Sequence, residues 1–95
     1  MLTKSQLKDL IHYDADTGLL TRINSPRPSK NGVINTTPNL GGYFKIKILG
    51  NLYYAHRLAW MYMHGEFPKN QISHVNGNKM DNRLVNLREF YKNLI

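Results

Sequence analysis

The sequence predicts a small α+β protein with an antiparallel β-hairpin and a buried central helix, and three observations support that class. Residues 43–48 alternate between polar or aromatic and apolar side chains, and a Leu-Gly-Asn turn and the return segment LYYA follow, so an antiparallel hairpin is predicted over residues 42–55. Residues 56–65 read HRLAWMYMHG, with apolar side chains at helical spacing and a glycine suited to close the helix. Residues 72–75 are strand-like and lead into the tight-turn signal Asn76-Gly77-Asn78.

The N-terminal 23 residues predict one short helix and one short strand. Thr3 and Gln6 have the spacing of a capping box, and apolar residues follow at helical spacing, so a helix is expected from about Lys4 to His12. The turn sequence DADTG precedes a predicted strand over residues 19–23. Residues 24–41 contain three of the four prolines together with Asn, Ser and Thr, and predict a loop.

Length and composition restrict the class of protein. Ninety-five residues are expected to form one domain, residues 1–95, and 41% hydrophobic content argues against a disordered chain. Without cysteine, the chain has neither disulfides nor thiolate zinc sites. The longest apolar run, LAWMYM, is too short for a membrane span, and the N-terminus lacks the apolar centre of a signal peptide. A cytoplasmic protein without membrane contact is therefore expected.

The distribution of charge points to a polyanionic partner. The net charge is +7, and no acid occurs from Thr17 to Gly65. That stretch contains six cations: Arg22, Arg27, Lys30, Lys45, Lys47 and Arg57. A field of one sign over half of a small protein favours nucleic acid, although it carries no sequence specificity. The alternative is a solvated basic surface that only aids solubility.

The predicted hairpin has one face that suits a nucleic-acid backbone. Phe44, Ile46 and Ile48 alternate with a set of polar and aromatic residues, Tyr43, Lys45 and Lys47. The two lysines are expected to contact phosphates, with the tyrosine against a sugar or base. An ordinary solvated sheet face would show the same pattern.

His74 is the residue most suited to catalysis, because it stands at the end of a predicted strand beside a tight turn. A histidine there could take a proton from a water that attacks a phosphodiester, provided that an asparagine carbonyl orients its other ring nitrogen. A divalent ion would then neutralise the scissile phosphate. The alternative is a histidine with a structural role.

The order of elements resembles the HNH endonucleases of bacteriophages, including the free-standing and homing types. The likeness runs from about Ile11 to Glu89, and its most specific parts are AHRLAW followed by HVNGNKMDNRLVNLR. It implies a C-terminal ββα-metal finger over residues 70–95, with LREF as its second strand. It also implies that His74 is the general base, that Asn86 orients His74, and that residues 81–83 shape the intervening loop. Arg83 and Arg88 become candidate phosphate contacts, and the cytoplasm of an infected bacterial host becomes the expected location.

The sequence departs from the HNH pattern at both expected metal ligands. The family usually has Asp immediately before the first His, and this chain has Ser73, whose neutral hydroxyl is a poor ligand for Mg²⁺ or Mn²⁺. The last His or Asn of the family falls at Ile95, and Asn93 is two residues away on the wrong helical face. The finger is therefore expected to have a truncated last helix and a degenerate active site, with its metal ligands unknown.

Three functions remain open from these residues. The favoured one is an HNH-family DNA-binding protein that retains His74 and Asn86 but cleaves weakly or not at all, and that uses Lys45, Lys47, Arg57, Arg83 and Arg88 to contact DNA. The second is an active HNH nuclease with Mg²⁺ or Mn²⁺. The third is an inhibitor or modulator of a host protein. A monomer and a homodimer are both compatible with the sequence. His56 could support the finger or reach a phosphate, and a packing role is its alternative.

Overall fold

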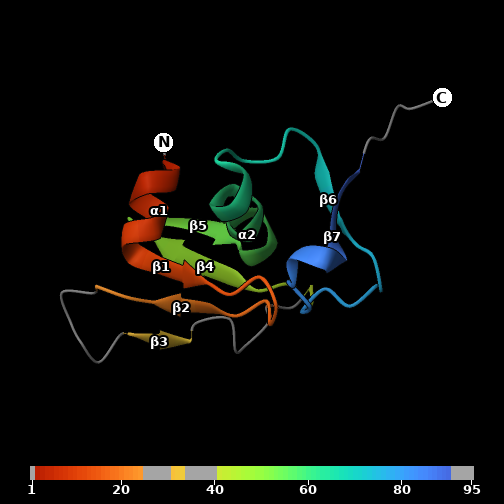
Figure 1. Ribbon diagram of the computed structural model, residues 1–95, viewed down its shortest axis with the longest axis horizontal. Coiled ribbons are helices and arrows are strands. Elements are labelled where there is room, and N and C mark those ends of the chain that lie inside the picture. Colours follow the sequence, from red (N-terminus) through yellow and green to blue (C-terminus); the bar gives the residue numbers. More distant parts are fainter. Residues whose placement is uncertain (1, 25–30, 34–40, 91–95) are drawn as a thin grey trace.

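The computed structural model describes residues 2–24, 31–33 and 41–90, and they form the predicted α+β fold with antiparallel sheets. Figure 1 shows the order of elements along the chain. In sequence they are α1 (Lys4–Leu10), β1 (Ile11–Tyr13), β2 (Leu20–Arg22), β3 (Gly32–Val33), β4 (Lys45–Ile48), β5 (Asn51–Tyr54), α2 (Ala55–His64), β6 (Gln71–His74), the 3-10 turn η2 (Leu84–Asn86) and β7 (Leu87–Phe90).

The predicted hairpin and central helix are confirmed. Strands β4 and β5 pair antiparallel from Lys45 opposite Tyr54 to Ile48 opposite Asn51. Helix α2 follows at once and ends at Gly65, which takes the left-handed conformation at φ 92° and bonds back to Met61. Glycine suits that position because a side chain would clash there with the backbone. Strands β6 and β7 form a separate pair at the end of the molecule away from α1 (Figure 1).

Two N-terminal predictions need correction. The capping box at Thr3 is present, but α1 ends at Leu10, because Ile11 is extended and pairs with Arg22. Residues 24–41 were expected to be a loop throughout, yet Gly32 and Val33 form strand β3 against β2. Strand β2 otherwise leaves the backbone groups of that edge unpaired, and β3 satisfies them. Residues 25–30 and 34–40 lie outside the described part of the chain.

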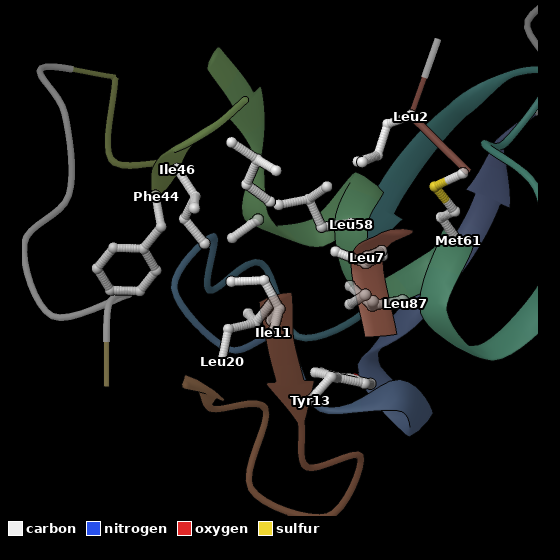
Figure 2. Packing of buried hydrophobic residues seen from close by; sticks show 13 residues of the cluster. Leu2, Leu7, Ile11, Tyr13, Leu20, Phe44, Ile46, Leu58, Met61 and Leu87 are labelled. Atoms are coloured by element: carbon white, nitrogen blue, oxygen red, sulfur yellow. The ribbon is translucent and has the colours of Figure 1, made fainter. Parts of the chain in front are cut away.

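The core joins segments from the whole described chain. Figure 2 shows side chains from α1, β1, β4, α2 and β7 packed together. The buried set is Leu2, Leu7, Ile11, Tyr13, Leu20, Phe44, Ile46, Ile48, Ala55, Leu58, Ala59, Met61 and Leu87. Because Leu87 follows the end of η2 and pairs with His74, this packing fixes the β6–β7 finger against the remainder of the fold. None of the described helices is long and apolar enough to cross a membrane.

Candidate functional site

His74 ends strand β6 and is half-buried, at the place where the sequence analysis put it. Its carbonyl accepts a bond from the Gly77 amide at 2.9 Å, which closes the turn, and Gly77 has φ 77°. The amide of the next residue, Val75, donates to the Asn86 carbonyl at 2.9 Å. The backbone on both sides of His74 is therefore fixed by short hydrogen bonds, so the imidazole has a defined direction.

Asn82 orients the His74 ring. The Nε2 atom of His74 lies 2.9 Å from Oδ1 of Asn82, and the Asn82 side chain is almost wholly enclosed. Since an amide oxygen only accepts, Nε2 carries the proton and the lone pair of the neutral ring is on Nδ1. No described residue bonds to Nδ1. The ring thus has the tautomer that a general base needs.

The expected contact between Asn86 and His74 is not present, and this part of the prediction is corrected. The Oδ1 atom of Asn86 accepts from the Asn76 amide at 2.9 Å, while its Nδ2 donates to Oδ1 of Asn76 and to the Asp81 carbonyl. All three bonds hold the loop between β6 and β7 together. Asn86 is buried and fully engaged there, so it supports the loop and leaves the histidine to Asn82.

Residues 76–83 form a loop built from short polar contacts. Asn76 and Asn78 serve as turn residues, but through their side chains: each Oδ1 accepts from the amide two positions on. Neither has positive φ, which the turn assigns to Gly77. Arg83 pairs with Asp81 at 2.8 Å, and this hydrogen bond lowers the pKa of Asp81 to about 2. Arg83 is thus held by a neighbouring carboxylate, which reduces the charge that it offers to a phosphate.

The N-terminal turn supports this loop from behind. The Tyr13 hydroxyl donates to the carbonyl of Asn82, and the Leu84 amide donates to the carbonyl of Ala15 at 3.0 Å. Burial, followed by the nearby carboxylates, raises the pKa of Tyr13 well above its ordinary value, so its hydroxyl stays a donor. A Cβ on Gly18 would lie 2.6 Å from the Arg83 amide nitrogen, so only glycine fits against the loop. The sequence contains no local signal of this support, since DADTG predicts only a turn.

An open groove of about 410 Å³ lies beside His74, whose ring contacts two of the groove's lining residues, Tyr43 and His56. It is lined by Tyr43, Tyr54, His56, Arg57, Gln71 and Ile72. The His56 ring lies edge-on to the His74 ring at 5.1 Å between centroids and stacks on Tyr54 at 5.3 Å. Burial, then the positive charge on His74 when protonated and on Arg57, lowers the pKa of His56 to about 4. His56 is therefore neutral near pH 7.

Of the predicted DNA contacts, Lys45 and Arg57 lie at the groove, whereas Arg88 lies on a different face. Lys45 and Lys47 are exposed on β4, and the ammonium of Lys45 lies 5.1 Å from the centre of the Tyr54 ring, so Lys45 borders the groove. Arg57 lines the groove itself. Arg88 is exposed opposite Ser73, and the pleat of the strands puts both on the face away from His74. Tyr43 lies on the lysine face as expected, because its ring contacts Tyr54, the cross-strand partner of Lys45, and it also lies beside His56 and His74 as part of the site wall.

The described residues do not suit a divalent metal. No group of three His, Cys, Asp or Glu side chains occurs among residues 2–24, 31–33 and 41–90. Ser73 faces away from His74, and the Asp81 carboxylate is engaged by Arg83 and Asn76. Mg²⁺ and Mn²⁺ prefer several hard oxygen ligands around one point, and this arrangement does not provide them. Asn93 and Ile95, which bear on the last ligand, lie outside the described residues.

Fold and site together define a small α+β protein that presents an oriented histidine at the end of a two-stranded finger. Residues 53–93 match the family model described as HNH endonuclease, which supports the HNH family for this segment and a nuclease-like, DNA-related function. HNH domains are typically metal-dependent. The match covers α2, β6 and β7, whereas the supporting residues Tyr13 and Gly18 precede it. No curated protein and no solved structure matches the chain.

Proposed function

We propose that this protein binds DNA through an HNH-like finger and a basic surface, and that it hydrolyses phosphodiesters weakly or not at all. One observation carries the proposal: the orienting bond to His74 is intact, while the position before it is a serine that faces the other side of the strand. The charge of +7 and the acid-free stretch supply the attraction to DNA. The resemblance to phage proteins further suggests action in the cytoplasm of a bacterial host.

The contribution of the chain itself to hydrolysis would come from His74. With Nε2–H bonded to Asn82, Nδ1 can accept a proton from a water as the water oxygen bonds to phosphorus and the bond from phosphorus to the leaving sugar oxygen breaks. General base catalysis of this kind supplies about 10²–10⁴-fold. A metal ion would add stabilisation of the leaving oxygen worth several kcal/mol, and the described residues include no group of three His, Cys, Asp or Glu side chains suited to hold one. Hydrolysis by the histidine alone is therefore expected to be slow.

An active, metal-dependent HNH nuclease is the second candidate function. The observation that favours it is also the tautomer of His74, because a ring whose Nε2 is bonded to Asn82 and whose Nδ1 is open is ready to act as a base. It differs from the first candidate in the rate of nicking and in the dependence on metal, so one assay separates them.

A plasmid-nicking assay with Mg²⁺ and then Mn²⁺, run beside a gel-shift titration at several salt concentrations, tests the proposal. We expect salt-sensitive binding and nicking close to background. His74→Ala is the informative variant, and His64→Ala at the far end of α2 is its matched control. Rapid metal-dependent nicking that disappears only in His74→Ala would establish the second candidate. Absence of binding at low salt would contradict both.

Ser73→Asp tests whether the missing carboxylate alone explains weak cleavage. We expect little gain in nicking, because the new carboxylate would stand on the strand face away from His74 and no second ligand is nearby among the described residues. The measurement is the initial nicking rate in Mn²⁺ for this variant beside Ser73→Asn, which has the same shape without the charge. Strong cleavage by Ser73→Asp alone would overturn this account of the ligands.

A further inference from the structure

His56 is the buried polar side chain that the proposed function leaves without a role. Its exposed fraction is 8%, and its neighbours in the ring cluster are Tyr43, Tyr54 and His74. Within the described residues, no hydrogen bond is made by either ring nitrogen. Among the described residues, Nδ2 of Asn82 is the only side-chain nitrogen or oxygen that is both fully enclosed and without a partner. The unpaired nitrogens of His56 are therefore not fully enclosed, and His56 lines the groove. An unpaired polar group in such a wall is suited to a ligand.

The amino end of α2 opens at the same place. His56 and Arg57 belong to the first turn of this ten-residue helix, which has no acidic residue and no side-chain cap from Tyr54. The amide of Ala55 donates to the Phe44 carbonyl. The amides of the next residues stand in the first turn of α2, where the helix itself offers them no carbonyl. Free amides and the positive end of the helix dipole favour an anion.

The chemistry around the groove also fits an anion. Arg57 supplies a permanent positive charge, Gln71 an amide, and Tyr54 a phenol, and none of the described residues that line the groove is acidic. Lys45 lies at its rim, over the ring of Tyr54. A neutral imidazole can donate one hydrogen bond to a phosphate oxygen, and a guanidinium can donate two.

We propose that His56, Arg57 and the amino end of α2 form a phosphate-binding subsite beside His74, which takes a backbone phosphate of the bound nucleic acid next to the one that His74 faces. This rests on the proposed function for the identity of the ligand. The low pKa of His56 agrees with it, because an empty subsite leaves a buried imidazole neutral among positive neighbours. Binding of a phosphate would favour the protonated ring and raise that pKa.

Inorganic phosphate, titrated into the full chain and followed by NMR of the histidine rings, tests the subsite directly. We expect saturable shifts of the His56 signals and a rise in the pKa of His56, while His64 on the same helix responds to neither. His56→Phe keeps the ring stacked on Tyr54 and removes both nitrogens, and we expect about tenfold weaker phosphate binding. His64→Phe is the matched control and should bind as the wild type does. Shifts at His56 and His64 of equal size, or none at His56, would overturn the subsite.

A duplex-binding measurement separates this inference from the proposed function. Arg57→Gln should weaken binding and lower the slope of log K against log salt by about one, and Lys8→Gln on α1 gives the same change of charge away from the groove. Salt-sensitive DNA binding that is unaltered in both His56→Phe and Arg57→Gln would refute the subsite and leave the proposed function standing. Saturable phosphate binding at His56 without any duplex binding would support the subsite and contradict the proposed function. His56→Gln, which retains a hydrogen-bond donor, is measured beside His56→Phe and takes its place if His56→Phe does not fold.

Discussion

At the scale of single residues, Asn82 has the orienting role that the sequence suggested for Asn86, and Asn86 has a separate role in the loop. Asn82 faces the His74 ring, and Asn86 holds the loop through three hydrogen bonds. Both are buried; Asn86 has partners for both polar atoms of its side chain, whereas Asn82 is held through its Oδ1, and breaking either set of bonds leaves a buried polar group unpaired. The polar cluster is therefore specific in geometry, and substitution of either asparagine has a different result.

Asn82→Ala is expected to release the ring of His74 and to lower the free energy of unfolding by about 1–3 kcal/mol. The ring loses the acceptor that fixes its tautomer, so both neutral tautomers become populated. The ¹⁵N shifts of the His74 ring measure this, and urea denaturation measures the stability. Asn78→Ala, in an exposed turn position, is the control and should preserve the tautomer. An unchanged His74 tautomer in Asn82→Ala would show that another group orients the ring.

The lowered pKa of His56 predicts how the free energy of unfolding depends on pH. Its pKa is about 4 in the folded protein against an ordinary value of 6.5, so the unfolded chain binds the proton first as the pH falls. Stability is then full above pH 6.5 and decreases between pH 6.5 and 4, by on the order of 3 kcal/mol for this group. Urea unfolding in phosphate-free buffer should show a smaller decrease for His56→Phe. Equal pH dependence in the two proteins would contradict the assignment.

At the scale of elements, the N-terminal turn and the finger act as one unit. Tyr13 and Ala15 bond to the backbone of the loop, and Gly18 lies against the backbone of Asn82 and Arg83. Tyr13 and Asn82, which are joined by one of these hydrogen bonds, are 69 positions apart in the sequence. The orientation of His74 therefore depends on a segment that precedes the family match.

Gly18→Ala is expected to displace the loop at Asn82 and to destabilise the fold by about 1–3 kcal/mol. The added Cβ would meet backbone atoms at 2.6 and 2.7 Å, and the φ of +78° is unfavourable for any side chain. Thermal unfolding measures the stability, and amide shifts of residues 82–84 report the displacement. Gly50→Ala separates the two causes, since Gly50 has φ +86° but open space around it. A loss of stability no larger than that of Gly50→Ala would show that the loop does not press on Gly18.

At the scale of the whole molecule, the positive charge is expected to decide affinity and the finger to decide orientation. Lys45 and Lys47 are exposed on β4, and Lys45 borders the groove. Replacing both with Gln should reduce the slope of log K against log salt by about two, because each phosphate contact releases about one counterion. Fluorescence anisotropy with a labelled duplex measures it. The control is the double replacement of Lys4 and Lys8 on α1, and an equal effect there would mean that DNA is bound without a preferred face.

The sequence by itself determined where α1 begins, where β4 lies and where α2 ends. The capping box at Thr3, the alternation over residues 45–48 and the glycine at position 65 act over a few residues, and each element lies where these local rules put it. The pairing of β2 with β3 was not predicted, because a two-residue strand has no periodic pattern. The end of the helix at Leu10 was not predicted either, because the β1–β2 pairing overrides helix spacing.

Only the tertiary structure decided which side chains meet at the site. Whether Asn82 or Asn86 faces His74 depends on how the loop folds back, and both amides have the same chemistry in the sequence. The support from Tyr13 and Gly18, and the placement of His56 against His74, arise from contacts between segments far apart in the chain. Local patterns carry no information on such contacts, because their geometry is set by the packing of a shared core.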